Sequence, residues 1–340
     1  MGAVPAGGVG MGPRGRTAGE DGAADGHVYA ALDLGTNNCR LLIARPTRAG
    51  FRVIDSFSRI VRLGEGLGAN GRLSEPAVDR AIAALKVCAG KIKRRGVTRF
   101  RNVATEACRR AANCDDFLAR VLAETGMVFE IISAEEEAAL ALAGCAPLIE
   151  DNVSHALVFD IGGGSTEVAW VKVDKEPRIV DYLSLPCGVV DMSERYDGRD
   201  VVPASYRAMI DEVAGRLAPF EARHGIRARV AGGGVQMIGT SGTVTTLMGM
   251  LLDLPRYDRA RVDGTRLEFD AMWAIADRLL GMDYDTRAAH PCILGARAEF
   301  VIPGTAILAA ICETWPVGRV TVADRGLREG ILLHLMAGGR

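Results

Sequence analysis

Two segments of the chain share a pattern of residue types that could bind phosphate. In ALVFDIGGGSTEVAWV, residues 156–171, an apolar run ends at Asp160 and is followed by three glycines, two hydroxyl residues and Glu167. The stretch AALDLGTNNCRLLIA, residues 30–44, repeats this arrangement around Asp33. One such turn could be a plain hairpin with glycine for geometry. Two copies in matching context indicate a duplicated structural unit.

Phosphate suits these turns because glycine permits positive φ and lets backbone N–H groups approach an anion. The candidate phosphate-binding residues of the two turns are Asp33, Gly35, Thr36, Asn37, Asn38 and Arg40, and Gly162, Gly163, Gly164, Ser165 and Thr166. A strand-end Asp can also hold a Mg²⁺ ion that bridges to phosphate. Asp160 and Glu167 are therefore candidate metal ligands, although Glu167 could instead be a solvated strand residue.

Three further stretches carry candidate catalytic or anion-binding groups. Glu135, Glu136 and Glu137 begin a predicted helix, where acidic residues are favourable and Ser133 with Glu136 would form a capping box. One of the three could be a general base that activates water, and spacing does not choose among them. Arg109 follows a predicted strand and could clamp a phosphoryl group, as could its neighbour Arg110. Ser241, Gly242 and Thr243 open a predicted helix whose N–H groups could bind an anion, or serve as an ordinary helix cap.

Other phosphate-binding patterns are absent from the sequence or unconvincing. There is no G-x-x-x-x-G-K-[ST] loop, and GEGLGA, residues 64–69, does not open directly into a predicted helix, which argues against a dinucleotide site. The eight cysteines include no C-x-x-C pair and are expected to be reduced and buried. The net charge of −1 excludes wholesale adhesion to nucleic acid or membrane but permits a local basic groove. We expect a cytoplasmic protein, since no signal peptide or membrane span is evident.

Apolar periodicity and turn residues predict two similar halves. We expect strands at 28–32, 40–44, 51–61, 99–105, 128–132, 155–160, 167–172 and 179–185, with helices at 74–96, 115–124, 133–144, about 203–223, 270–281 and 303–313. A three-strand meander followed by further α/β elements thus occurs twice. This predicts an α/β protein of two lobes, with both glycine turns lining the cleft between them.

Several stretches together resemble one known family. They are DLGTNNCRLLI, ATEACRRAAN, IISAEEEAALALAG, VFDIGGGSTEVAWV, LPCGVVDMSERY, GTSGTVTTL and GLREGIL, in this order. They resemble the exopolyphosphatase/guanosine pentaphosphate phosphohydrolase (Ppx/GppA) family over roughly residues 28–336. This resemblance implies the duplicated actin/sugar-kinase/Hsp70-like fold in its short, two-domain form. The expected divisions are a disordered tail at 1–26, a first lobe of 27–134 with about 325–340, and a second lobe of 135–324.

The resemblance also implies roles for individual residues. Glu137 would be the catalytic base and Arg109 its phosphoryl-binding partner, while Asp160 and Glu167 would handle Mg²⁺ and phosphate. Ala134, Glu135 and Cys39 depart from the family's usual residues without removing a catalytic group. A homodimer is a further expectation from the resemblance.

Four functions remain open on the sequence. The first is an exopolyphosphatase that releases terminal phosphate from polyphosphate, with Arg40 and Arg62 along the path of the chain. The second is a guanosine pentaphosphate phosphohydrolase using the same chemistry. The third is a non-hydrolysing nucleotide sensor, and the fourth is a sugar or acetate kinase of the same superfamily.

Overall fold

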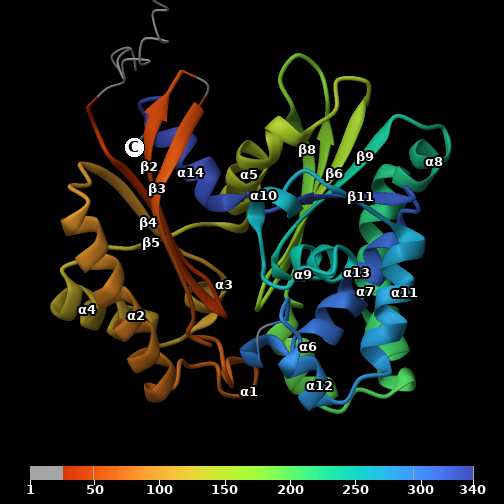
Figure 1. Ribbon diagram of the computed structural model, residues 1–340, viewed down its shortest axis with the longest axis horizontal. Coiled ribbons are helices and arrows are strands. Elements are labelled where there is room, and N and C mark those ends of the chain that lie inside the picture. The colour runs from red at the N-terminus through yellow and green to blue at the C-terminus, as the bar shows by residue number, and fades with distance from the viewer. Residues whose placement is uncertain (1–25, 49, 294, 340) are drawn as a thin grey trace, which may run out of the picture.

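The structure is a computed structural model that describes residues 26–48, 50–293 and 295–339 (Figure 1). The expected tail lies outside these ranges except for Gly26. The first lobe is built on a five-stranded sheet of order β3-β2-β1-β4-β5. Its strands are β1 (Tyr29–Leu34), β2 (Asn38–Thr47), β3 (Gly50–Ile60), β4 (Arg99–Ala104) and β5 (Glu130–Ile131). The helices α2 (Glu75–Arg94) and α4 (Cys114–Thr125) pack on one face of this sheet.

The second lobe repeats this plan on a larger scale. Its sheet has the order β10-β11-β9-β6-β7-β8, so that β8-β7-β6-β9-β11 corresponds to β3-β2-β1-β4-β5. The strands are β6 (His155–Ile161), β7 (Thr166–Lys172), β8 (Arg178–Leu185), β9 (Val235–Thr240), β10 (Arg266–Glu268) and β11 (Arg319–Ala323). The longer helices are α7 (Pro203–His224), α9 (Gly242–Leu251), α11 (Phe269–Leu280) and α13 (Val301–Thr314). The predicted duplicated, two-lobed α/β fold is confirmed.

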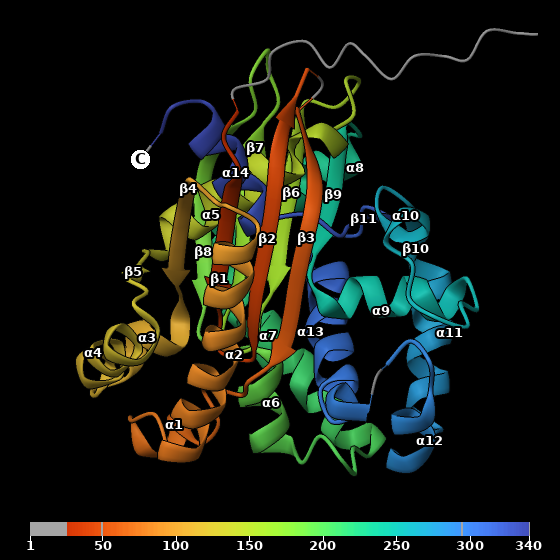
Figure 2. The same cartoon turned by 60° about the vertical axis from the view of Figure 1, so that its left-hand side comes forward.

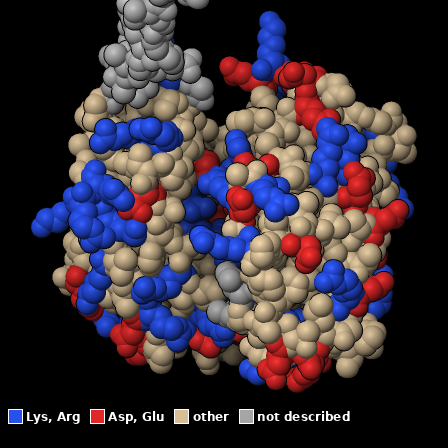
Figure 3. All heavy atoms as spheres, viewed as in Figure 1, with Lys and Arg blue, Asp and Glu red and all other residues tan. Residues whose placement is uncertain are grey.

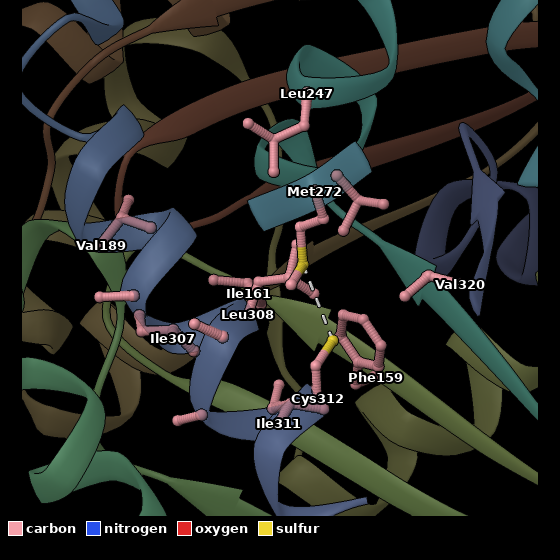
Figure 4. Packing of buried hydrophobic residues seen from close by; sticks show 14 of the residues in the cluster. Phe159, Ile161, Val189, Leu247, Met272, Ile307, Leu308, Ile311, Cys312 and Val320 are labelled. Carbon is pink, nitrogen blue, oxygen red and sulfur yellow. Dashed lines mark hydrogen bonds between the residues drawn. The ribbon is translucent and has the colours of Figure 1, made fainter. Parts of the chain in front are cut away.

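The core of the second lobe surrounds α13. Figure 4 shows Ile307, Leu308 and Ile311 of this helix packed towards Phe159 of β6 and Met272 of α11. Twelve consecutive residues of α13, 301–312, are buried. A helix that is apolar on every side is stable only inside a core. The prediction of a buried helix at 303–313 is therefore confirmed.

Two helices cross between the sheets and join the lobes. They are α5 (Ala134–Cys145) and α14 (Leu327–Met336), which pack against each other. Leu140 of α5 packs with the underside of β1 and β2, whereas Leu142, half a turn on, packs with β6 and β7. A Cβ at Gly330 would lie 1.9 Å from the carbonyl oxygen of Leu140, so only glycine permits this close crossing. The crossing fixes the start of α5, and with it the acidic triplet, relative to both sheets.

The sequence patterns missed the shortest elements. These are the helices α1 (Leu67–Asn70), α3 (Glu106–Arg110), α6 (Val189–Tyr196), α8 (Ile226–Ala231), α10 (Arg259–Val262) and α12 (Tyr284–Ala289), and the strand β10. Most are one or two turns long, too short to show a helical period. Figures 1 and 2 both place α1 beside α6 at one end of the cleft. There the backbone N–H of Gly66 donates to the carboxylate of Glu194 across the lobes, over 2.9 Å.

Candidate active site

The two glycine turns are built alike. In the first, the N–H of Gly35 donates to the carbonyl of Asn38 over 2.9 Å, and in the second the N–H of Gly162 donates to the carbonyl of Ser165 over 2.9 Å. The strand registers close both turns with the same number of residues. The sequence repeat is therefore a structural repeat.

The turns contact each other where the lobes meet. A Cβ at Gly163 would lie 3.0 Å from the backbone nitrogen of Asn37, and one at Gly164 would lie 2.7 Å from the hydroxyl oxygen of Thr36. The glycines are thus required for close approach between the lobes. The expectation of positive φ is wrong here, because Gly35 and the three glycines 162–164 lie outside the positive-φ region.

Four carboxylates gather beside the turns. The β-strand register places Asp160 opposite Glu167, and Asp33 opposite Arg40. Burial, together with Glu167, raises the pKa of Glu137 to about 8, and burial with Glu137 raises that of Asp160 to about 7. Burial, with Asp160 adding to it, raises the pKa of Glu167 to about 7, and burial raises that of Asp33. Such crowding of acidic groups favours a cation or a proton among them.

Glu137 is held by an arginine from the other lobe. Arg109 donates from Nη1 to the Glu137 carboxylate over 2.8 Å and to the carbonyl of Ile132 over 2.9 Å. Its Nε and Nη2 donate to Glu106 over 3.1 and 3.0 Å. The guanidinium is therefore fixed by one carboxylate and directed at another. Sequence reasoning missed Glu106, although it lies three residues before Arg109 on one helical turn.

The other two acidic residues of the triplet face away. Glu136 pairs with Arg101 over 2.6 Å, and Glu135 lines a separate groove beside β8. Ser133 caps α5 by accepting from the N–H of Glu136 over 3.1 Å. Only this half of the predicted capping box is present. The reciprocal bond from the Glu136 side chain to the backbone of Ser133 is not formed, because the Glu136 carboxylate is bound to Arg101. The structure thus resolves the choice that spacing left open: Glu137 alone of the three lines the cleft.

Five arginines of the described residues line the cleft, and two of them, Arg259 and Arg325, are paired with carboxylates. Arg40, Arg297 and Arg328 line a hollow of about 1230 Å³ that also contains both turns and Glu137. Within the described ranges, none of these three guanidinium groups has a hydrogen-bond or ion-pair partner. Burial lowers the pKa of Arg297, and nearby Arg40 lowers it further. Burial also lowers the pKa of Arg328. Figure 3 shows Lys and Arg side chains gathered in the groove between the lobes.

The hollow contains most of the predicted phosphate-binding residues. They are Asp33, Gly35, Thr36, Asn37, Asn38, Arg40, Gly162, Gly163, Gly164, Ser165, Ser241, Gly242 and Thr243. Ser241 does cap α9, since its hydroxyl accepts from the N–H groups of Thr243 and Val244.

Other residues predicted for the site do not line the hollow. Thr166 lies behind the turn, fully buried, and its hydroxyl donates to the carbonyl of Cys187 over 2.7 Å, so it is withdrawn from any phosphate. Glu167 and Arg109 do not line the hollow either: Glu167 is buried, and Arg109 contacts Glu137, which does line it. Arg62 forms an ion pair with Glu299 of the other lobe. Sequence reasoning did not select Arg297 and Arg328, although GLREGIL, which contains Arg328, had been singled out.

A family model matches most of the chain. The model of the Ppx/GppA phosphatase family matches residues 42–338. The chain belongs to the Ppx/GppA phosphatase family. Membership makes it a hydrolase of phosphoanhydride bonds.

Ppx/GppA relatives match over most of the chain. Exopolyphosphatase 2 of Mycobacterium tuberculosis is 30% identical over 319 residues, covering 90% of this chain and 98% of the relative. Guanosine-5'-triphosphate,3'-diphosphate pyrophosphatase of Aeromonas hydrophila is 28% identical over 309 residues, covering 91% of this chain but only 59% of the relative. The crystal structure of the Aquifex aeolicus Ppx/GppA family member is similar with a TM-score of 0.76 and 28% identity, covering 92% and 98% of the two chains.

Proposed function

We propose that this Ppx/GppA protein is an exopolyphosphatase that releases terminal phosphate from polyphosphate. The observation that carries the proposal is the composition of the hollow. The hollow is lined by Glu137, by the two turns, and by three arginines that have no hydrogen-bond or ion-pair partner among the described residues. The hollow then continues along β3 to Gly50 and Phe51. An elongated hollow that holds Arg40, Arg297 and Arg328 beside the buried carboxylate of Glu137 fits a linear polyanion that is cleaved at its end.

Each group would act on the terminal phosphoryl. Glu137 would orient the attacking water and accept its proton, and a base works best when its pKa lies near the working pH. Arg109 would hold Glu137 in place and add positive charge beside the reacting phosphorus. Arg40, Arg297 and Arg328 would bind phosphates along the chain, because the guanidinium fork matches phosphate oxygens.

The carboxylates fit a Mg²⁺ ion held jointly with substrate. Asp160 and Glu167 are opposite each other, both with raised pKa, and Mg²⁺ is usually held by one or two carboxylates plus phosphate oxygens. The described residues contain no group of three or more His, Cys, Asp and Glu side chains able to hold a metal alone. When bound, Mg²⁺ would neutralise charge on the transferred phosphoryl. The role of Mg²⁺ remains a proposal.

Guanosine pentaphosphate is the second candidate substrate. The Aeromonas relative carries the corresponding name, and the hollow is also lined by Tyr257 and Phe300, which could stack against a base. Cytoplasmic location and a homodimer stay predictions. Among the described helices, none has the length and apolar character that a bilayer crossing requires.

Phosphate release tests the proposal directly. The native protein would be assayed with Mg²⁺ on long-chain polyphosphate, guanosine pentaphosphate and ATP, beside Glu137→Ala. Fastest release from polyphosphate, abolished in the variant, is the expected result. Preference for guanosine pentaphosphate would move the assignment to the second candidate. Absence of release from all three would refute the hydrolase mechanism.

A further inference from the structure

Basic residues are concentrated in two segments of the first lobe. Residues 40–62 and 86–99 contain only one acidic residue, Asp55, in a chain where 41 basic and 42 acidic residues nearly balance. The basic residues of these segments are Arg40, Arg45, Arg48, Arg52, Arg59, Arg62, Lys86, Lys91, Lys93, Arg94, Arg95 and Arg99. The fold brings the segments together, because Asp55 of β3 pairs with Lys91 over 2.6 Å and with Arg95 over 2.8 Å at the end of α2.

Strand alternation sorts these side chains between two faces of the β2–β3 hairpin. Arg45 is opposite Arg52 and Cys39 is opposite Arg59 in the register, so these arginines lie on the face away from the cleft. We call Arg45, Arg52, Arg59, Lys91, Arg95 and Asp55 the hairpin patch. Figure 3 shows Lys and Arg gathered over this part of the first lobe with few acidic side chains among them.

The hairpin patch keeps an excess of positive charge. Its one carboxylate, Asp55, is shared by two cations, and their hydrogen bonds lower its pKa to about 2. Arg45 and Arg52 are exposed. In the part of the chain that the structure describes, neither has an ion-pair partner. The repulsion between these charges is relieved when a polyanion binds.

The patch and the hollow of the active site lie on opposite faces of the hairpin, on either side of the edge of β3. Ser58, Ser56 and Val53 line the hollow from the cleft side of β3, and Gly50 and Phe51 carry the hollow to the hairpin tip. β3 is the edge strand of the sheet, so no further strand blocks a path around its edge from one face of the hairpin to the other. From the turn at Asn38 to Arg45 is seven residues along β2, roughly 24 Å at about 3.4 Å per residue.

We propose that the hairpin patch binds the distal phosphates of a long polyphosphate chain whose end lies at Glu137. The inference rests on the proposed exopolyphosphatase function and adds a length preference to it. A chain long enough to leave the hollow at Gly50 would pass over the edge of β3 onto Arg52 and Arg45. A chain of three phosphates is too short to span the distance from the turns. The patch would therefore increase the affinity of the enzyme for long chains only.

The test compares two double charge reversals. Arg45→Glu/Arg52→Glu removes the centre of the patch, and Arg227→Glu/Arg229→Glu on α8 of the second lobe is the matched control, since both of its arginines are also exposed. We expect the patch variant to lose about tenfold or more in kcat/KM on long-chain polyphosphate at low salt, and the loss to shrink as salt rises. Tripolyphosphate should be hydrolysed at the native rate by both variants.

Other outcomes would overturn the inference. An equal loss on tripolyphosphate would mean that the variant disturbs the site itself, and native kcat/KM on long chains would mean that the patch is idle. A variant that loses only binding to a labelled DNA oligonucleotide would assign the patch to nucleic acid. Binding of fluorescent long-chain polyphosphate in the presence of a chelator is measured in parallel. An inactive native protein would refute the exopolyphosphatase proposal, whereas equal binding by the native protein and the patch variant would refute the patch.

Discussion

Replacing Glu137 by Gln should lower activity and raise stability at the same time. The side chain accepts a hydrogen bond from Arg109 over 2.8 Å, yet burial and the nearby Glu167 raise its pKa to about 8. Gln has nearly the same shape and keeps an acceptor for Arg109, but it cannot take a proton from water. We expect kcat on polyphosphate to fall by about 10²–10⁴, the usual contribution of a general base. KM should change much less, because the phosphate-binding groups remain.

The gain in stability follows from the direction of the pKa shift. Glu ionises near 4.5 in the unfolded chain but near 8 in the folded protein, so its contribution to stability is full below pH 4.5 and is lost as the pH rises through 8. Each pH unit between these values costs about 1.4 kcal/mol. At pH 7 the cost is on the order of 3 kcal/mol. Glu137→Gln removes it, so the variant should unfold several degrees higher than the native protein at pH 7 and at the same temperature near pH 4.5.

Phosphate release measures the effect on activity. Thermal unfolding in the presence of a chelator measures the effect on stability. Glu136→Gln is the matched control, because Glu136 is the adjacent residue of α5 but pairs with Arg101 away from the hollow. Its kcat should stay near the native value. A Glu137→Gln variant with native kcat would refute the role as base. A variant less stable than the native protein at pH 7 would refute the account of the crowded carboxylates.

Three further predictions test the surroundings of Glu137, and the patch reversal described above tests the length preference. Arg297→Gln should raise KM for polyphosphate by about tenfold or more with a smaller change in kcat, since it removes a charge-assisted hydrogen bond of about 1.5–3 kcal/mol; native KM would exclude Arg297 from substrate binding. Gly163→Ala should lower both activity and Tm because its Cβ would lie 3.0 Å from Asn37, whereas Gly215→Ala, in open space on α7, should be neutral or stabilising; similar effects of the two would contradict the contact between the turns. Asp55→Asn should cost about 1–2 kcal/mol of unfolding free energy at pH 7, and urea titrations should show this difference disappearing as the pH falls from about 4 to about 2, because the ordinary pKa of Asp55 is 3.8 and the folded pKa is about 2. A pH-independent difference would show that its ion pairs do not carry the effect.

Much of the site could be predicted because its residues are neighbours in sequence. The paired Asp-x-Gly turns lie between consecutive strands, so strand register alone sets Asp160 opposite Glu167. Thr166 was placed wrongly for a related reason. It is adjacent to Ser165 in sequence, but alternation along β7 directs its hydroxyl to Cys187, behind the turn.

The remaining parts of the site come from segments far apart in the chain. Arg297 and Arg328 reach the hollow from the second half of the sequence, and no local pattern distinguishes them from surface arginines. Glu106 is recognisable only once Arg109 is seen to bridge it to Glu137. The choice among the three acidic residues of α5 likewise depends on which side of that helix faces the first lobe.

The sequence by itself determined the repeated strand–turn–strand units, the buried helix α13 and which side chains stand at the two turns. These depend on apolar periodicity and on local turn residues, which act over a few positions. The tertiary structure decided that the glycines serve contact between lobes and that Glu137 rather than its neighbours faces the hollow. It also decided that three arginines without a partner among the described residues line that hollow. Those outcomes depend on how two sheets are held across α5 and α14, and packing between distant segments is not encoded in any one of them.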